Sequence, residues 1–414
     1  MGVESKHDTE FLLSTPIPTF PLQGGRRYFK YFALSSISMT RRNAPIVPVA
    51  TTEGNQSAGI KSGVAVKGRG TANKVDPRYL DNTREVFDDG WGEDGEARPI
   101  RTTVTLETPR TIISRNDSPD IPFTASINPY RGCEHGCIYC YARPSHAYMD
   151  LSPGIDFESR LFAKPGAAKL LEQELGKPGY QCTPIALGTN TDPYQPIERD
   201  YRITRQIIEV LSAHHHPLTI VTKSWAVERD IDLLAGMAAR NLAQVFVSVT
   251  TLDHDLARKL EPRATAPRRR LETLTRLHEA GIPTGVMFAP VIPALNDTEM
   301  ESVLAAAANA GVLHAGYVML RLPHEVRILF REWLKTHYPL KADHVMNLVR
   351  DIRGGRENDP AFGSRMRGEG VFAEIIEQRF RKVCNDLGLN KKQVTLDASC
   401  FTPPVVPGSQ LSLL

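Results

Sequence analysis

Between about residue 120 and residue 340, short apolar segments alternate with amphipathic helical segments, and this alternation restricts the fold most. The apolar segments lack the period-two pattern of a half-exposed strand, as expected when both faces of a sheet are covered. Strands that alternate with helices form parallel sheets with right-handed crossovers. The six predicted strands are residues 124–128, 183–188, 217–224, 244–251, 282–293 and 315–323.

The predicted fold class is α/β, a partial (β/α)6 barrel of the TIM type, because six units are too few to close an eight-stranded barrel. In such barrels the chemistry lies at the carboxyl ends of the strands. Residues 96–338 are expected to form this core with a preceding segment, and residues 339–414 a helical C-terminal extension. The predicted helices are residues 166–176, 202–214, 228–242, 267–281, 297–311, 344–353 and 369–387.

The first 95 residues are rich in Gly, Ser, Thr, Pro and charge, which predicts a mostly disordered region. The whole chain, 41% hydrophobic and 23% charged, has the composition of a globular protein. It contains no apolar run approaching the roughly eighteen residues of a membrane span, and no basic segment before an apolar one as in a secretory signal. The net charge of +3 neither favours nor excludes a nucleic-acid partner.

Three of the six cysteines lie within eight residues, in "CEHGCIYC", directly after the first predicted strand. Cys133, Cys137 and Cys140 have C-x3-C-x2-C spacing, and three thiolates on one loop indicate a metal site. A structural zinc needs four ligands, so His135 or His146 would have to complete it. A [4Fe–4S] cluster held by three cysteines leaves one iron open for a cofactor or substrate. The missing fourth cysteine favours the iron–sulfur cluster, and a zinc-stabilised nucleic-acid-binding protein without catalysis is the alternative.

The other three cysteines are dispersed along the chain, at Cys182, Cys384 and Cys400. They predict neither a second cluster nor a disulfide framework. A reducing compartment follows from this cysteine usage, and a cytoplasmic location is expected.

The C-x3-C-x-aromatic-C motif, placed after the first strand of a partial barrel, resembles the signature of radical S-adenosylmethionine (SAM) enzymes. Other segments resemble the spore photoproduct lyase and DNA-repair-photolyase-like group, and the resemblance covers about residues 120–340. It implies an enzyme in which Cys133, Cys137 and Cys140 hold a [4Fe–4S] cluster and SAM chelates the open iron. Reductive cleavage of SAM would yield a 5′-deoxyadenosyl radical that abstracts hydrogen from a substrate. The segments concerned are "GTNTDPYQPIE" (188–198), "IVTKS" (220–224), "VSVTT" (247–251), "LEP" (260–262) and "APVIPALND" (289–297).

The same resemblance implies that Thr191, Lys223 and Ser248 contact SAM. Hydroxyl groups suit the amino group or ribose of SAM, and an ammonium suits its carboxylate. For Thr191 and Ser248, ordinary hydrogen bonding at strand ends is an equal alternative. The resemblance also implies an electron donor of the flavodoxin or ferredoxin type. The substrate stays open among DNA, RNA, a peptide and a cofactor.

One position departs from the resembled group. The spore enzyme has a hydrogen-donating cysteine where this chain has Thr189, and the O–H bond of threonine is too strong to replace a thiol in that role. Cys182 lies at the other end of the same predicted strand. The resemblance therefore implies radical generation, but not repair of the spore thymine dimer.

Several further polar groups could bind a ligand. The three histidines His214–His216 predict a solvated helix end rather than a metal site, because neighbouring side chains point in different directions. "FGSRMRGEG" (362–370) is either a phosphate-binding loop or a flexible connection. Substrate contacts are expected of Asp192, Tyr194 and Glu198, and a solubilising role, ahead of nucleic-acid binding, is expected of Arg263 and Arg268–Arg270.

Overall fold

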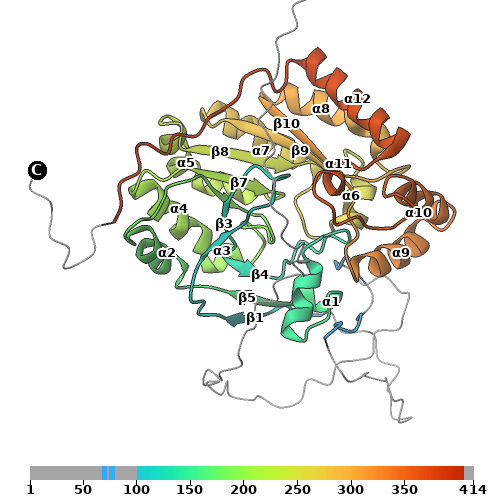
Figure 1. The fold of residues 1–414 in the computed structure, drawn as a ribbon, viewed down its shortest axis with the longest axis horizontal. Coiled ribbons are helices and arrows are strands. Elements are labelled where there is room, and N and C mark those ends of the chain that lie inside the picture. The colour runs from blue at the N-terminus through green and yellow to red at the C-terminus, as the bar shows by residue number, and fades with distance from the viewer. Residues whose placement is uncertain (1–67, 72–73, 80–99, 405–414) are drawn as a thin grey trace, which may run out of the picture. The chain divides into compact units, whose positions relative to one another are not determined.

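The computed structural model describes residues 68–71, 74–79 and 100–404 (Figure 1). Its central sheet has seven strands in the order β10-β9-β8-β7-β6-β3-β2. All neighbours are parallel except β2 (Ile113–Arg115), which pairs antiparallel with β3 at one edge. The fold is therefore α/β with a parallel sheet, consistent with the predicted partial barrel. The parallel strands are β3 (Ala125–Ile127), β6 (Ile185–Leu187), β7 (Leu218–Thr222), β8 (Ala243–Ser248), β9 (Thr284–Val291) and β10 (His314–Met319).

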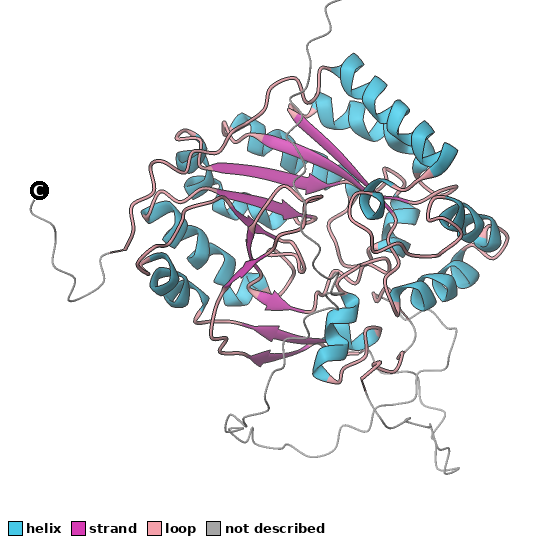
Figure 2. Cartoon of the chain, in the orientation of Figure 1, coloured by secondary structure: helices cyan, strands magenta, loops and turns pink. Residues whose placement is uncertain are grey.

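Helices lie around the outside of these strands (Figure 2). Strands β3 and β6 are buried at every residue, which explains why their sequences show no alternation. The helices that connect the parallel strands are α2 (Ala167–Leu175), α3 (Glu198–Tyr201), α4 (Ile203–Ala213), η2 (Trp225–Asp230), α5 (Ile231–Ala238), α6 (His254–Leu260), α7 (Pro267–Glu279), η3 (Asp297–Glu299) and α8 (Met300–Asn309).

A second, smaller sheet was not predicted from the sequence. Strand β5 (Arg160–Ala163) lies between β1 (Thr103–Leu106), to which it is parallel, and β4 (Tyr130–Arg131), to which it is antiparallel. These strands have only two to four residues, too few for a recognisable hydrophobic period. The helices η1 (Arg143–Met149) and α1 (Ile155–Ser159) precede β5, so the segment after the cysteines folds back beneath them.

A helix that the prediction lacked, α9 (Val326–His337), lies at the end of the predicted core of residues 96–338. The extension that begins at residue 339 is helical, as predicted. Helices α10 (Ala342–Asp351), α11 (Ser364–Arg367) and α12 (Gly370–Leu387) follow. Helix α12 lies against α8, where Arg379 pairs with Glu301 at 2.6 Å. Beyond α12 the chain runs along the amino ends of the strands, with backbone hydrogen bonds that include Thr402 N to His214 O at 3.0 Å.

The disorder predicted for residues 1–95 falls almost entirely outside the described residues. Two pieces of that region are described, 68–71 and 74–79, and both contact the core. Arg69 is buried and donates to the carbonyl of Glu158 at 2.6 Å, and Ser152 Oγ donates to the carbonyl of Val75 at 2.6 Å. Among the described residues, no helix is both long and apolar enough to cross a membrane.

The three adjacent histidines have different environments. His216 is fully buried; its Nε2 lies 2.8 Å from the hydroxyl of Tyr180, and its ring meets Phe401 edge-on. His214 Nδ1 lies 3.0 Å from the carbonyl of Thr402. The prediction of a solvated helix end is therefore wrong for His216, which instead anchors the C-terminal segment.

Acidification should weaken the fold through His216. Burial lowers the pKa of His216 to about 4, whereas a histidine in the unfolded chain titrates near about 6.5. The unfolded state therefore binds the proton first, and up to about 3 kcal/mol of stability is lost as the pH falls through this window. We expect urea midpoints to decline between about pH 6.5 and pH 4, with a shallower decline for His216→Asn. The same decline in both proteins would contradict this assignment.

Candidate functional site

The three clustered cysteines lie on a compact loop that leaves the carboxyl end of β3. Gly136 N donates to Cys133 O at 3.3 Å and Cys140 N to Cys137 O at 3.2 Å, so tight turns bring the three residues together. Gly136 has φ +67°, a conformation that favours glycine. The Cys133 and Cys137 side chains are buried, and Cys140 is partly exposed. Burial raises the pKa of the Cys133 thiol, and the negative charges of Asp192, Cys137 and Cys140 raise it further, so the thiols interact electrostatically.

This donor set fits an iron–sulfur cluster better than a single ion. Among residues 68–71, 74–79 and 100–404, no three His, Cys, Asp or Glu side chains gather as ligands of one metal ion. Thiolates of a cluster bind different irons and need not converge on one point. The two histidines that would complete a zinc site have other partners. His146 Nε2 lies 3.0 Å from the carbonyl of Arg160, and His135 Nδ1 lies 3.4 Å from Asp192 Oδ2.

A buried arginine supports the cysteine loop from behind. Arg143, at 0% exposure, donates to the carbonyls of Cys137 at 2.9 Å and Gly136 at 3.1 Å, and to Glu158 Oε1 at 2.5 Å. Its Nη1 donates to the carbonyl of Gly154 at 2.9 Å, on the turn before α1. One side chain thus fixes both the loop and the turn that packs beneath it.

The short segment 68–71 packs on the same part of the loop. Gly70 N donates to Glu158 Oε2 at 2.9 Å, the carboxylate that also holds Arg143. A Cβ atom on Gly70 would lie 1.7 Å from the carbonyl oxygen of Gly136. Only glycine can approach the loop this closely.

Replacement of Gly70 by alanine should therefore displace this segment. We expect a loss of about 1–3 kcal/mol in the free energy of unfolding, typical of overpacking, and a lower urea midpoint. Gly166→Ala is the matched control, because nothing lies within 4 Å of its Cβ position. Equal midpoints for the two variants would contradict the packing described.

Gln195 holds the other end of the loop. Its Oε1 accepts from Glu134 N at 3.0 Å and its Nε2 donates to Gly132 O at 3.1 Å, so one buried amide spans Cys133. The residue lies within the predicted segment 188–198, but only its contacts reveal this role. The loop between β6 and α3 thereby positions the first cysteine.

The three predicted SAM contacts lie at the carboxyl ends of neighbouring strands. Thr191 follows β6, Lys223 follows β7 and Ser248 ends β8. Lys223 Nζ lies 5.9 Å from the centre of the Tyr139 ring, so it reaches the cysteine loop. Although burial opposes its charge, the negative charges of Cys137 and Glu261 raise the pKa of Lys223. Thr191 Oγ1 donates to the carbonyl of Tyr130 at 3.1 Å, an ordinary structural bond that leaves its lone pairs able to accept.

A buried polar network beside Lys223 was not predicted. Glu261 accepts from Tyr139 on the cysteine loop, from Thr250 Oγ1 at 2.6 Å and from Arg270. Arg270 is 1% exposed and donates to the carbonyl of Ser248 at 2.9 Å, so a solubilising role is wrong for it. Although burial opposes its charge, the positive charges of Arg270 and Lys223 hold the pKa of Glu261 at about 2. The neighbouring Arg268 is exposed, as expected.

The three residues predicted to contact substrate have structural partners. Asp192 accepts from Thr222 Oγ1 at 2.7 Å and from Lys223 N at 2.7 Å, which ties the end of β6 to the end of β7. Tyr194 is buried and donates to Asp230 Oδ2 at 2.9 Å, and Glu198 accepts from the Tyr130 hydroxyl. Tyr194 and Glu198 are both buried, so they stabilise the loop between β6 and α3. The prediction of substrate contact does not hold for these two residues.

Thr189 stands beside the cysteine loop. Its Oγ1 accepts from Asn128 Nδ2 at 3.1 Å, and its carbonyl accepts from the hydroxyl of Tyr141, the residue after Cys140. The position expected to differ from the resembled enzyme thus contacts the side chain of the residue that follows the third cysteine. It presents a hydroxyl there rather than a thiol.

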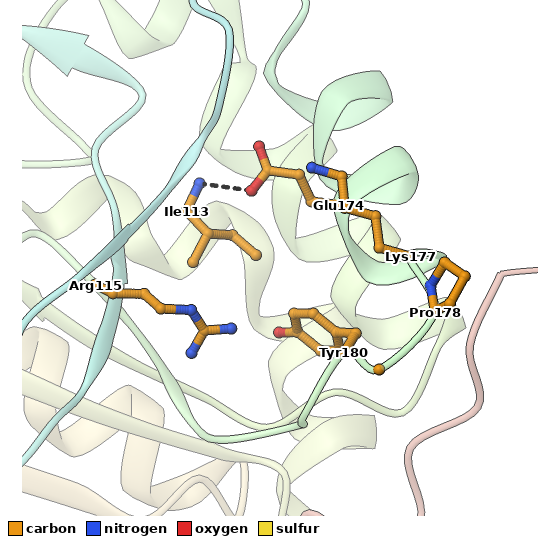
Figure 3. Close-up of a pocket in the computed structure, with 7 residues that line it drawn as sticks. Ile113, Arg115, Glu174, Lys177, Pro178 and Tyr180 are labelled. Atoms are coloured by element: carbon orange, nitrogen blue, oxygen red, sulfur yellow. Dashed lines mark hydrogen bonds between the residues drawn. The ribbon is translucent and has the colours of Figure 1, made fainter.

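The cavity in Figure 3 lies away from this site. It measures about 270 Å³ and is lined by residues that include Arg115, Glu174 and Tyr180. Arg115 pairs with Ala125, the first residue of β3, so this cavity is at the amino end of the sheet. Glu174 Oε2 accepts from Ile113 N at 3.3 Å, as drawn in Figure 3, which fixes the edge strand to α2.

Comparison with known proteins identifies the family. A family model described as the radical SAM superfamily matches residues 127–307. An uncharacterized protein of Mycobacterium tuberculosis is 38% identical over 232 residues, which cover 56% of this chain and 68% of that protein. The chain belongs to the radical SAM superfamily. A second relative of this radical SAM protein, an uncharacterized protein of Methanocaldococcus jannaschii, is 26% identical over 53% of this chain and 79% of its own.

The fold of this radical SAM protein is also similar to that of solved structures. Spore photoproduct lyase complexed with dinucleoside spore photoproduct superposes with a TM-score of 0.52 at 16% identity, over 73% of this chain and 85% of that chain. This similarity concerns the fold. The superfamily predicted from "CEHGCIYC" is confirmed, and this radical SAM protein is an enzyme.

Proposed function

We propose that the protein uses Cys133, Cys137 and Cys140 to hold a [4Fe–4S] cluster that supplies reductive cleavage of SAM and hence hydrogen abstraction by a 5′-deoxyadenosyl radical. The observation that carries this proposal is the cysteine loop itself. Three thiols, two of them buried, lie on one loop that follows the carboxyl end of a parallel strand. Within the described residues, no three His, Cys, Asp or Glu side chains are placed to bind a single metal ion, as a zinc site would require. Arg143 and Gln195 hold the loop in shape through its backbone.

Thr191, Lys223 and Ser248 are the proposed contacts of SAM. Lys223 supports this best, because its cation lies near the cysteine loop and its own backbone N–H is fixed by Asp192 at 2.7 Å. An ammonium held there would bind the carboxylate of SAM. Loops from three strand ends would exclude water around the reacting atoms, and this is the protein's contribution to radical chemistry.

The proposed substrate is a nucleic acid, DNA or RNA, although its reaction would differ from that of the spore enzyme. The support is the fold shared with a protein whose complex contains a dinucleoside. The difference is expected because Thr189 offers no thiol beside the loop. An electron donor of the flavodoxin or ferredoxin type and a cytoplasmic location complete the proposal. We also propose that the chain is divided into a core of residues 96–338 and a C-terminal extension of residues 339–414.

Metal content and electron paramagnetic resonance test the proposed cluster. Protein purified without oxygen should contain about four irons and four sulfides, and its reduced signal should shift when SAM is added. Cys137→Ala should lose the iron, whereas Cys400→Ala, at an exposed cysteine outside the loop, should keep it. Zinc without iron or sulfide would instead support the zinc-binding alternative and overturn the proposal.

A further inference from the structure

An arginine lies beside the cysteine loop and pairs with no acidic side chain among the described residues. Arg321 follows β10, the last parallel strand, and so stands at the same end of the sheet as the cysteines. Its guanidinium lies 5.4 Å from the centre of the Tyr141 ring, and Tyr141 is the residue after Cys140. Tyr141 is 47% exposed, so solvent and ligands reach this position. Arg321 therefore lies beside a solvent-exposed side chain of the cysteine loop.

The hydrogen bonds of Arg321 are unusually poor for a partly buried cation. Its Nε is buried and has no acceptor in the part of the chain that the structure describes. Its Nη1 points to Met366 Sδ at 3.8 Å, and a thioether is a weak acceptor. A buried guanidinium without an anion is costly, so partners are normally provided.

Other buried arginines of this protein do have partners. Arg143 pairs with Glu158 at 2.5 Å, and Arg270 pairs with Glu261. Arg353, near Arg321, donates to the carbonyls of Leu320 and Ser364, each at 2.7 Å. In the described part of the chain, Arg321 has neither a carboxylate partner nor a pair of carbonyl acceptors.

Within the part of the chain that the structure describes, the carboxylate that influences Arg321 is Asp120, and it already binds another arginine. Asp120, from the segment between β2 and β3, binds Arg365 through both oxygens, with Nε–Oδ2 at 2.6 Å, and accepts from Gly363 N at 3.1 Å. Burial and the charge of Arg365 lower the pKa of Arg321. Positive charge therefore exceeds negative charge around Arg321, and an anion would relieve the imbalance.

We propose that Arg321 binds an anionic oxygen group of the substrate, a phosphate or a carboxylate, beside the cysteine loop. The planar guanidinium binds such groups through two parallel hydrogen bonds. The inference rests on the proposed function, because it assigns Arg321 to the substrate of the cluster. It also restricts that substrate to molecules whose anion can reach the edge of Tyr141.

Anion binding to the reconstituted protein tests this assignment. Inorganic phosphate and acetate, titrated by calorimetry at constant ionic strength, stand for the two anion classes. At least one should bind saturably to the wild-type protein, and Arg321→Gln should weaken that binding by about tenfold or more. Arg321→Lys keeps the positive charge but cannot form the two parallel hydrogen bonds of a guanidinium, so anion affinity should fall by only a few fold. This variant replaces Arg321→Gln in the test if Arg321→Gln fails to fold. Arg268→Gln, whose side chain is 93% exposed, makes the same charge change and should bind like the wild type.

Two results would overturn the inference. One is that neither anion binds the wild-type protein, or that Arg321→Gln binds as tightly as Arg268→Gln. The other is displacement of the bound anion by SAM, which would assign Arg321 to the cofactor carboxylate. SAM cleavage is measured on the same wild-type preparation. Protein that forms 5′-deoxyadenosine but binds no anion contradicts this inference alone, whereas protein that forms none contradicts the proposed function.

Discussion

Replacement of Arg143 by methionine should lower the free energy of unfolding by about 3–5 kcal/mol and prevent retention of the cluster. Methionine approximates the length of the side chain but leaves Glu158 as a buried, unpaired carboxylate. It also removes the donors to the carbonyls of Gly136 and of Cys137, the second cysteine ligand proposed. Urea midpoints and iron content of the reconstituted protein measure the two effects.

The losses of stability and of iron in Arg143→Met should persist when Glu158→Gln is added to the same protein. The second change removes the unpaired charge, but the carbonyls of Gly136, Cys137 and Gly154 still lack their donor. Arg268→Met is the control, because its exposed side chain predicts a change within about 0.5 kcal/mol. Wild-type iron content in Arg143→Met would show that the loop keeps its shape without this arginine, contrary to the role assigned to it.

Glu261→Ala should also cost about 3–5 kcal/mol, for a related reason. Arg270 would remain fully buried without its carboxylate, and the Tyr139 and Thr250 hydroxyls would lose their acceptor. Because Tyr139, which lies beside Lys223, would lose its acceptor, the cysteine loop should shift there, and we expect weaker binding of SAM alongside the loss of stability. Urea midpoints and SAM titrations of the variant measure both.

A double-mutant cycle isolates the Glu261–Arg270 pair. Arg270→Met alone should be as harmful as Glu261→Ala, since either change leaves one buried charge unpaired. Removing both charges should cost less than the sum of the single changes, by about 2 kcal/mol or more. Additive losses would indicate that the two side chains contribute independently, against the network described.

The parallel strands could be predicted because burial on both faces leaves uninterrupted apolar runs, as in "IAL" of β6 and "VFV" of β8. The small β1-β5-β4 sheet could not be, since its register depends on pairings such as Val104 with Leu161. Helix α9 begins soon after β10, without a side-chain cap to mark its start.

The candidate site was predictable where its residues are neighbours in sequence. Cys133, Cys137 and Cys140 share one loop, so their spacing alone indicated a cluster. The supports of that loop come from distant segments: Glu261 meets Tyr139 across 122 positions, and Gln195 meets Glu134 across 61. A single sequence shows an arginine at position 270 but not the carboxylate it faces. For this reason a buried ion pair was mistaken for a basic surface.

The most direct test of the central claim is the product of SAM cleavage. Anaerobically reconstituted protein, given SAM and dithionite, should form 5′-deoxyadenosine, quantified by liquid chromatography with mass spectrometry. Cys137→Ala should form none above the protein-free background, while Cys400→Ala should match the wild type. Absence of 5′-deoxyadenosine from wild-type protein that carries its full iron and sulfide, or equal amounts from Cys137→Ala, would contradict the account.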